Sequence, residues 1–469
     1  MKFDIENLGK IKQANIELKD LTIICGPNSS NKTWLSYFIN HSLQTVNHSL
    51  ANTAMHINDE LSKEVDALIK EGEASIDLDK HFHVFERAFE LCTTIALDKL
   101  PGYFNLSSNT FSDTHFTLDT GFCLNKTKGT TIDGRRVQLI KEPNSNIAKI
   151  EFDLSETNPK LLSAGFFRHL MRREVYSSLA KVYLSDSTLN PFVITSERTG
   201  CMVFQPEIDR STIKAKEVFS ELERFSELES LPPEVFETLE ELSHGEQYTY
   251  ASPVKHNVNV IRDANLKMRE DSFIAEHHPE VLEAMNKVNG GTFSYANSQL
   301  MFTTEDESNT LPVSISSSSI KSLFLLDLYI KSIAGPNDLL LIDEPELNLH
   351  PDNQRLMARV IARLVNTGVK VLITTHSDYL IREINNSIML SNEFDEKEAI
   401  MQSHGFKQSD ILKPTQVSAY MVGNEGNKAV VSEMKVGQLG INTQIFDCII
   451  NSANQLQSEI YFNLDDVDE

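Results

Sequence analysis

The stretch LTIICGPNSSNKTWL, residues 21–35, decides the fold class of this chain. Its apolar run Leu21–Cys25 predicts a buried strand, and the helical pattern that begins at Trp34 predicts a helix. The intervening GPNSSNKT matches the phosphate-loop pattern G-x-x-x-x-G-K-[ST], except that Asn31 replaces the second glycine. Asparagine adopts unusual backbone angles at little cost, so the loop can keep its shape. We therefore expect a strand, a phosphate-binding loop and a helix in succession.

Loops of this kind bind phosphate because their backbone N–H groups converge on its oxygens beside a helix N-terminus. Lys32 is expected to act in catalysis by reaching the outer phosphates, and the Thr33 hydroxyl to ligate Mg²⁺. The candidate phosphate-binding residues are Gly26, Pro27, Asn28, Ser29, Ser30, Asn31, Lys32 and Thr33. The loop thus predicts a site for a nucleotide and a divalent cation.

A second motif, LLLIDEPELNLHP at 339–351, places two adjacent carboxylates at the end of an apolar strand. Uncompensated charge is costly there, and Mg²⁺ with a reacting water explains the pair. We expect Asp343 to hold the metal and Glu344 to orient or deprotonate the attacking water. A third motif, VLITTHSDYL at 371–380, puts His376 beyond the next buried strand. From there it can reach the terminal phosphate or the same water, as a third catalytic residue.

The order of these elements predicts the type of sheet. A strand at 339–342, a helix at 351–367 and a strand at 369–374 form a strand-helix-strand succession, which is typical of a parallel sheet. Before the phosphate loop, alternating apolar and polar residues predict antiparallel strands. We therefore expect an α/β fold with a mixed sheet.

Together the motifs carry a family resemblance. GPNSSNKT, LLLIDEPELNLHP and TTHSD, in this order and after an N-terminal strand pair, resemble ABC-type ATPases of the RecF, SMC and OLD group. The similarity is greatest to prokaryotic AAA-type ATPases, including the ATPase subunits of anti-phage systems such as Septu and PARIS. It covers 1–32 and 290–390. The resemblance implies an ABC-type P-loop ATPase with antiparallel N-terminal strands and an inserted helical region. It also implies ATP and Mg²⁺ as cofactors and a homo-oligomer, a dimer or multiple of dimers, with ATP at the subunit interfaces.

The resembling family has a signature before the carboxylate strand, usually with a serine and two glycines, which contacts ATP bound to the opposite subunit. Here that place reads VSISSSSIKSLFLLDLYI, 313–330. Ser317, Ser318 and Ser319 precede a predicted helix, so hydroxyls and N–H groups can still reach an anion. The glycines are absent, as at Asn31. We expect a working ATP site with slow turnover, used as a switch: binding favours closure and hydrolysis releases it.

Three further groups are weaker candidates. Ser196-Glu197-Arg198 resembles a sequence at the nucleotide-facing edge of related ATPases, where the glutamate or arginine would contact phosphate or water; a surface ion pair is the alternative. His350 resembles a position that contacts the facing subunit, again with a structural alternative. His277-His278-Pro279 has no third ligand in sequence and is expected to be a loop without metal.

We expect a discontinuous ATPase domain at 1–50, 100–200 and 290–395, with a helical insertion at 51–99. A glutamate-rich helical hairpin is expected at 205–289. Its apolar stripe consists of Val218, Phe219, Leu222, Phe225 and Leu228. The C-terminal α/β extension, 396–469, either completes the ATPase core or provides a docking surface.

Composition limits the partners. The net charge is −24 and the sequence pI is about 5.0, so the surface repels polyanions and nucleic acid is possible but not favoured. There is no long apolar run and no secretion signal, so we expect a cytoplasmic protein without membrane contact. The five scattered cysteines predict neither disulfides nor a zinc site.

Three functions remain to be weighed. The resemblance favours a regulatory ATPase of anti-phage defence that controls a separate effector protein such as a nuclease. A RecF-like repair ATPase that clamps DNA is the alternative. A self-contained OLD-type nuclease is disfavoured, because fewer than a hundred residues follow Leu390 and the acids of the terminal LDDVDE have no sheet to support them.

Overall fold

The computed structural model describes most of the chain. The described residues are 1–57, 61–121, 127–134, 136–152, 165–184, 189–205, 207–208, 250–296, 299–426, 428–442 and 444–463. The expected apolar stripe of the helical hairpin, from Val218 to Leu228, lies outside them. Among the described residues, no helix combines the length and the apolar character that a bilayer crossing requires.

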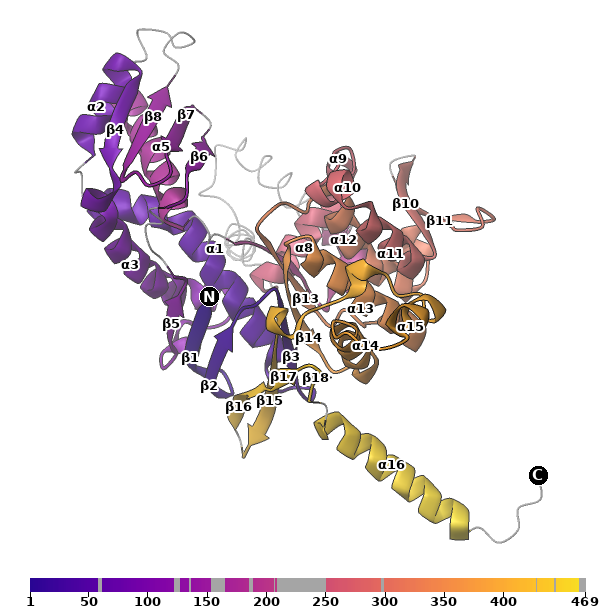
Figure 1. The fold of residues 1–469 in the computed structure, drawn as a ribbon. Helices are drawn as coiled ribbons and strands as arrows, with labels where there is room; N and C mark the ends of the chain where they lie inside the picture. Colours follow the sequence, from indigo (N-terminus) through magenta and orange to yellow (C-terminus); the bar gives the residue numbers. More distant parts are fainter. Residues whose placement is uncertain are drawn as a thin grey trace, which may run out of the picture.

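A mixed nine-stranded sheet forms the centre of the molecule (Figure 1). Its order is β5-β1-β2-β16-β15-β3-β14-β13-β9. The strands are β1 Lys2–Leu8, β2 Ile11–Glu17, β3 Leu21–Cys25, β5 His115–Asp119, β9 Asn190–Ile194, β13 Asp338–Asp343, β14 Lys370–Thr375, β15 Val417–Glu425 and β16 Lys428–Met434. β15, β3, β14, β13 and β9 run parallel, whereas β1 pairs antiparallel with β2 and β5. The expected α/β fold with a mixed sheet and antiparallel N-terminal strands is confirmed.

The middles of the parallel strands β13, β14 and β3 are largely apolar because helices cover both faces of the sheet. Every residue of β3 and β13 is buried. Successive side chains of β13 enter different cores: Leu339 and Leu341 pack in one, and Leu340 and Ile342 in the other. This double burial leaves the strand ends as the place for polar chemistry.

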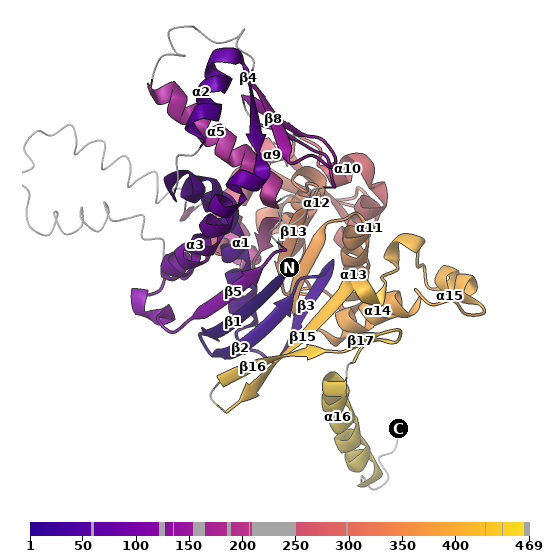
Figure 2. The same cartoon turned by 60° about the vertical axis from the view of Figure 1, so that its left-hand side comes forward.

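Helices far apart in sequence form the two layers (Figure 2). One layer contains α1 Lys32–Ile57, α3 Leu78–Phe104 and α5 Gly165–Leu184. The other contains α8 Ser252–Arg262, α9 Ala264–Lys267, α10 Phe273–His277, α11 Pro279–Asn289, α12 Ser318–Ser332, α13 Pro351–Asn366 and α14 Asp378–Met389. α15 Lys397–Ser403 follows α14 at the edge of the second layer.

A small lobe stands beside the first layer. It contains α2 Ser62–Glu71 and a four-stranded sheet of β4 Glu73–Asp77, β8 Ile147–Phe152, β7 Val137–Lys141 and β6 Thr130–Asp133. The segment 51–99, expected to be a helical insertion, thus also supplies a strand. The reason is the alternation of EASID, in which Ala74 and Ile76 are buried and their neighbours exposed. A separate three-stranded sheet consists of β10 Gly291–Ala296, β11 Gln299–Thr304 and β12 Thr310–Pro312.

The C-terminal segment contributes to the central sheet, since β15 lies between β16 and β3. Of the two alternatives for this segment, completion of the core therefore describes β15 and β16. Two short strands, β17 Val436–Gly437 and β18 Gly440–Ile441, then pack near α14. The last helix, α16 Gln444–Asn463, extends away from the body (Figure 1).

Candidate nucleotide-binding site

The carboxyl ends of β3, β14, β13 and β9 lie side by side in the sheet. β3 and β14 are parallel neighbours, and so are β14 and β13. The phosphate loop at 26–33, the carboxylates at 343–344 and His376 therefore meet at one edge, as parallel strands require. β14 lies between the loop strand and the carboxylate strand, so its last threonines stand at the middle of the site.

The loop has the backbone of a phosphate-binding turn. Gly26, Ser29 and Asn31 have φ of +155°, +61° and +68°. Asn31 thus holds the left-handed conformation that the missing glycine would hold without strain. Its carbonyl accepts the backbone N–H of Leu35 at 3.1 Å, which starts α1 directly after the loop. Asparagine at this position is therefore compatible with the left-handed backbone that the loop adopts.

The first glycine is required by packing. A Cβ atom at Gly26 would lie 2.6 Å from the carbonyl oxygen of Val422, on β15. The C-terminal strand thus forms the back wall of the loop. Within the loop, the Ser30 hydroxyl is buried and has no hydrogen-bond partner among the described residues. A tight loop with an unpaired buried hydroxyl fits a ligand rich in oxygen acceptors, as phosphate is.

Lys32 is positioned at the mouth of the loop. Its Nζ donates to the carbonyl oxygens of Gly26, at 2.9 Å, and Pro27, at 2.8 Å. Burial lowers the pKa of Lys32, while the charges of Glu344 and Asp343 oppose that shift. A polyphosphate would replace these neutral acceptors with anionic ones, which favours the charged ammonium.

Thr33 and Asp343 are in direct contact although 310 positions separate them. Thr33 Oγ1 donates to Asp343 Oδ2 at 2.9 Å, and the hydroxyl of Thr374, on β14, also donates to this carboxylate. Burial raises the pKa of Asp343, and the nearby Glu344 and Glu197 charges add to the rise. An acid buried beside other acids is stabilised by a cation, and a hydroxyl with a carboxylate is a donor set that Mg²⁺ accepts. These residues therefore fit the expected metal.

Glu344 and His376 face each other beyond Asp343. His376 Nδ1 lies 3.5 Å from Glu344 Oε1. Glu344 has a φ of +51°, which is rare for a side-chain-bearing residue, and its N–H donates to Thr374 O at 3.0 Å. In this conformation the carboxylate of Glu344 lies beside the ring of His376.

Sequence reasoning missed Glu346. This buried acid accepts hydrogen bonds from Thr375 Oγ1, at 2.7 Å, and from the His376 N–H, at 3.0 Å. Its Oε1 also lies 3.5 Å from His376 Nδ1. It thus holds the backbone and the ring of the histidine. The available signal was a third acid in DEPE, close after an apolar strand.

Arg198 is buried, so it does not form the surface ion pair that was the alternative for this segment. Within the described part of the chain its guanidinium donates to backbone carbonyls: Thr195 O at 3.1 Å, Asp343 O at 2.8 Å, Glu344 O at 2.7 Å and Ser322 O at 3.0 Å. It therefore contacts the peptides of the carboxylate motif. Glu197 is exposed and accepts from the buried Tyr37 hydroxyl at 3.4 Å.

The hydrogen bonds described for the serine run are local. Ser317 caps α12 by accepting the Ile320 N–H at 3.3 Å, and Ser318 and Ser319 begin the helix. Ser317 and Ser318 are exposed. No hydrogen bond among the described residues joins this run to the phosphate loop of the same chain. The structure therefore brings together the loop, the carboxylates and His376, but not the serines.

The other three candidate histidines, His350, His277 and His278, have local partners. His350 caps α13 by accepting the Asp352 N–H at 3.4 Å, and 74% of its side chain is exposed. His277 contacts the Phe273 carbonyl at 3.1 Å, and His278 lies 3.2 Å from Glu280. His350 thus has a structural role as a helix cap, with a ring still open to solvent.

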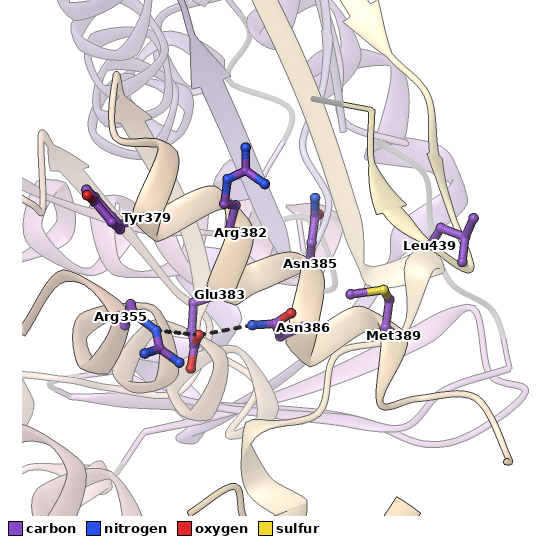
Figure 3. A pocket seen from close by; sticks show the side chains of 8 residues that line it. All are labelled: Arg355, Tyr379, Arg382, Glu383, Asn385, Asn386, Met389 and Leu439. Carbon is purple, nitrogen blue, oxygen red and sulfur yellow. Dashed lines mark hydrogen bonds and ion pairs between the residues drawn. The ribbon is translucent and has the colours of Figure 1, made fainter. Parts of the chain in front are cut away.

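A hollow outside the strand-end site lies along α14 (Figure 3). Its volume is about 360 Å³, and Tyr379, Met389 and Leu439 form apolar parts of its lining. The buried Glu383 at its floor is already bonded to Arg355 at 3.0 Å and to Asn386 at 3.1 Å. The carboxylate of Glu383 is therefore already paired within the protein. The candidate catalytic and metal-binding residues lie at the strand ends, outside this hollow.

Comparison with known proteins identifies the family of this chain. The model of the family described as AAA ATPase domain matches residues 1–381. A protein of Listeria monocytogenes serotype 4b (strain F2365), described as an ABC transporter ATP-binding protein, is 34% identical over 95 residues. That match covers 18% of this chain and 35% of the Listeria protein, so the chain spans well under half of that relative's length.

Solved structures of SMC heads are also similar. One is the head bound to the C-winged helix domain of ScpA, with 11% identity, a TM-score of 0.34, and coverage of 93% of this chain and 98% of that one. Another is the Pyrococcus furiosus head with an extended coiled coil, bound to the C-terminal domain of ScpA. It has 11% identity, a TM-score of 0.32, and 98% coverage of both chains. Both TM-scores are low, so these structures carry no argument about the site. The description of the site depends only on the contacts given above.

Proposed function

Because this chain belongs to the family described as AAA ATPase domain, we propose that it binds Mg²⁺ and ATP at the strand ends and hydrolyses ATP slowly. The observation that carries the proposal is the 2.9 Å hydrogen bond from Thr33 to Asp343. It joins the phosphate loop to the carboxylate strand, so that the two halves of one site meet. The buried, unpaired Ser30 hydroxyl and the loop lysine supply further donors to phosphate.

Each residue has a role in this proposal. The loop N–H groups and Lys32 bind the phosphates, while Thr33 and Asp343 hold the metal. Bound there, Mg²⁺ would neutralise charge on the outer phosphate oxygens. Glu344 accepts a proton from the attacking water or orients it, and His376, 3.5 Å away, fixes the direction of that carboxylate.

We further propose that ATP joins two copies of the chain. The exposed Ser317 and Ser318 are not bonded to their own loop, which supports a role on the nucleotide of a second copy. ATP between two subunits supplies contacts that neither has alone, so binding favours closure and hydrolysis reverses it. In this scheme the protein is a cytoplasmic homo-oligomeric switch.

The effector is assigned from the family resemblance. The motifs resemble ATPase subunits of anti-phage systems, and the proposal is that the closed form controls a separate protein such as a nuclease. The alternative is a repair ATPase that clamps DNA. The net charge of −24 disfavours it, because DNA affinity depends on clustered basic residues.

ATP turnover with and without DNA tests these proposals. The wild-type protein is expected to release phosphate in a Mg²⁺-dependent reaction, and Glu344→Gln to be about 10²- to 10⁴-fold slower with nucleotide binding retained. Glu398→Gln, an exposed acid on α15, is the matched control and is expected to equal the wild type. Equal rates for wild type and Glu344→Gln would refute the ATPase. Strong stimulation by DNA ends would favour the repair alternative.

A further inference from the structure

Arg198 is a buried charged group whose described hydrogen bonds go to neutral acceptors, while the carboxylates of the DEPE motif lie close enough to favour its charge without bonding to it. It is 2% exposed, and none of the described ion pairs includes it. Its bonds go to four carbonyl oxygens on three segments: the end of β9, the end of β13 and the first turns of α12. Burying a guanidinium costs more than burying an apolar side chain even where nearby acids offset part of that cost, so this arrangement is a poor device for stability alone.

One of those bonds holds a strained peptide. Glu344 has a φ of +51° and precedes Pro345, and both conditions disfavour the conformation for a side-chain-bearing residue. The residue is held from two sides. Its N–H donates to Thr374 O at 3.0 Å, and its carbonyl accepts Arg198 Nη2 at 2.7 Å. A strained residue persists only where its surroundings determine it. Arg198 shares this role with the Leu347 N–H, which also donates to the Glu344 carbonyl, at 3.0 Å.

A second bond connects the same arginine to α12. Arg198 Nε donates to Ser322 O at 3.0 Å. The Ser322 hydroxyl has two acceptors within reach, Ser319 O in its own helix at 2.8 Å and Leu347 O in the turn after Glu344 at 3.2 Å. Ser322 stands one turn beyond the exposed serines that begin α12. A shift of this helix would therefore pull on Arg198 and on the turn that carries Glu344.

We propose that Arg198 is a positioning residue that holds the backbone of Glu344 and ties it to α12. When α12 is displaced, the carboxylate of Glu344 leaves its working direction, so that turnover depends on what the serine run contacts. The inference rests on the proposed ATPase function and deepens it. Arg198 itself does not touch substrate in this scheme.

Arg198→Lys tests the hold on Glu344. An ammonium has three donors from one atom and cannot span four carbonyls on three segments, as the planar guanidinium does. We expect kcat to fall about 10- to 100-fold, as for a small displacement of a catalytic group. The dissociation constant for ATP, measured on a fluorescent analogue, should change less than about threefold, because Arg198 does not bind the phosphate loop.

Ser322→Ala tests the tie to α12. It removes the hydroxyl contacts to Ser319 O and Leu347 O but leaves the Ser322 carbonyl to Arg198. We expect a smaller fall in kcat. In the double variant the two effects should be non-additive, since both act on the same turn. Additive effects would remove the link to α12 from the proposal.

The results separate the two levels of inference. If the wild type shows no turnover above Glu344→Gln, the proposed function fails. If the wild type turns over and Arg198→Lys equals it, only the role of Arg198 fails. If Arg198→Lys weakens ATP binding and kcat in the same proportion, with a large fall in Tm, the arginine is a general stabiliser and the positioning role is overturned.

Discussion

The phosphate loop and the serine run both lack glycines that the resembling ATPases carry, but the two losses differ in kind. At Asn31 the backbone adopts a left-handed φ of +68°. The position therefore requires a residue that tolerates positive φ, and asparagine is one. In the serine run, Ser316 and Ser317 have φ of −74° and −62°, and no residue of 313–319 has a positive φ. A residue that tolerates a left-handed backbone is therefore required in the phosphate loop but not in the serine run.

The regions also differ in exposure. The loop is closed from behind by Val422, and its lysine is buried. Ser317 and Ser318 are open to solvent at the start of α12. This contrast supports a site in which one chain supplies phosphate and metal ligands and a second chain supplies the serines.

The largest expected effect comes from a heterodimer in which one chain has a disabled phosphate loop and the other a disabled serine run. Lys32→Ala disables the loop, and Ser318→Glu places a negative charge at the serine run, where the helix terminus tolerates it but phosphate does not. Each variant alone should have background turnover. A heterodimer isolated through two affinity tags has one intact composite site, so about half of the wild-type turnover is expected. An inactive heterodimer would contradict the composite site.

The next largest effect tests whether position 31 requires a residue that tolerates positive φ. Asn31→Val puts a β-branched residue at a φ of +68°, and the strain should weaken ATP binding about 10- to 100-fold, measured by titration of a fluorescent analogue. Asn31→Gly is the matched control and should stay within about threefold of the wild type in binding. A much faster turnover of Asn31→Gly would show that the asparagine slows the reaction, as the sequence predicts.

A smaller effect concerns the folding stability that is lost when the carboxylate of Asp343, the proposed metal ligand, is buried in its charged form. Burial raises the pKa of Asp343, so folding stability falls as pH rises from the ordinary carboxyl value through the raised one. Asp343→Asn removes this penalty and should raise Tm by a few degrees at pH 8, with the gain shrinking as pH is lowered. The same variant should lose Mg²⁺-dependent turnover. A lower Tm at every pH would contradict the assigned cause.

The smallest effect tests the serine run as a helix start. Ser317 caps α12 through a 3.3 Å bond, and Ser317→Ala should cost about 1 kcal/mol of unfolding free energy in urea titration. Ser318→Ala, at the next position and without a capping bond, should cost less. Equal and negligible costs would show that the cap contributes nothing to stability.

The sequence was sufficient for the strand-loop-helix unit, the carboxylate strand and the histidine strand. Their signals are local: an apolar run of strand length followed by a polar motif. Membership of the AAA ATPase domain family agrees with that prediction at the level of the family. The position of β14 between β3 and β13 was not visible, because strand order depends on crossovers rather than on any one segment.

The contacts of Arg198 and Glu346 could not be predicted from local sequence patterns. Each acts through groups brought close by the sheet: Arg198 on the carbonyls of Asp343 and Ser322, and Glu346 on Thr375 and His376. In sequence, one is an arginine after a short strand and the other an acid among acids. Their partners lie on different segments, so composition and spacing cannot reveal them.

By itself the sequence determined which residue types stand at the ends of which buried strands, because apolar runs and their polar termini are properties of neighbouring residues. Only the tertiary structure decided that Thr33 meets Asp343, that β15 closes the loop from behind, and that the serine run stays exposed. These features depend on long-range packing of the sheet and its helices, in which residues hundreds of positions apart exclude water together.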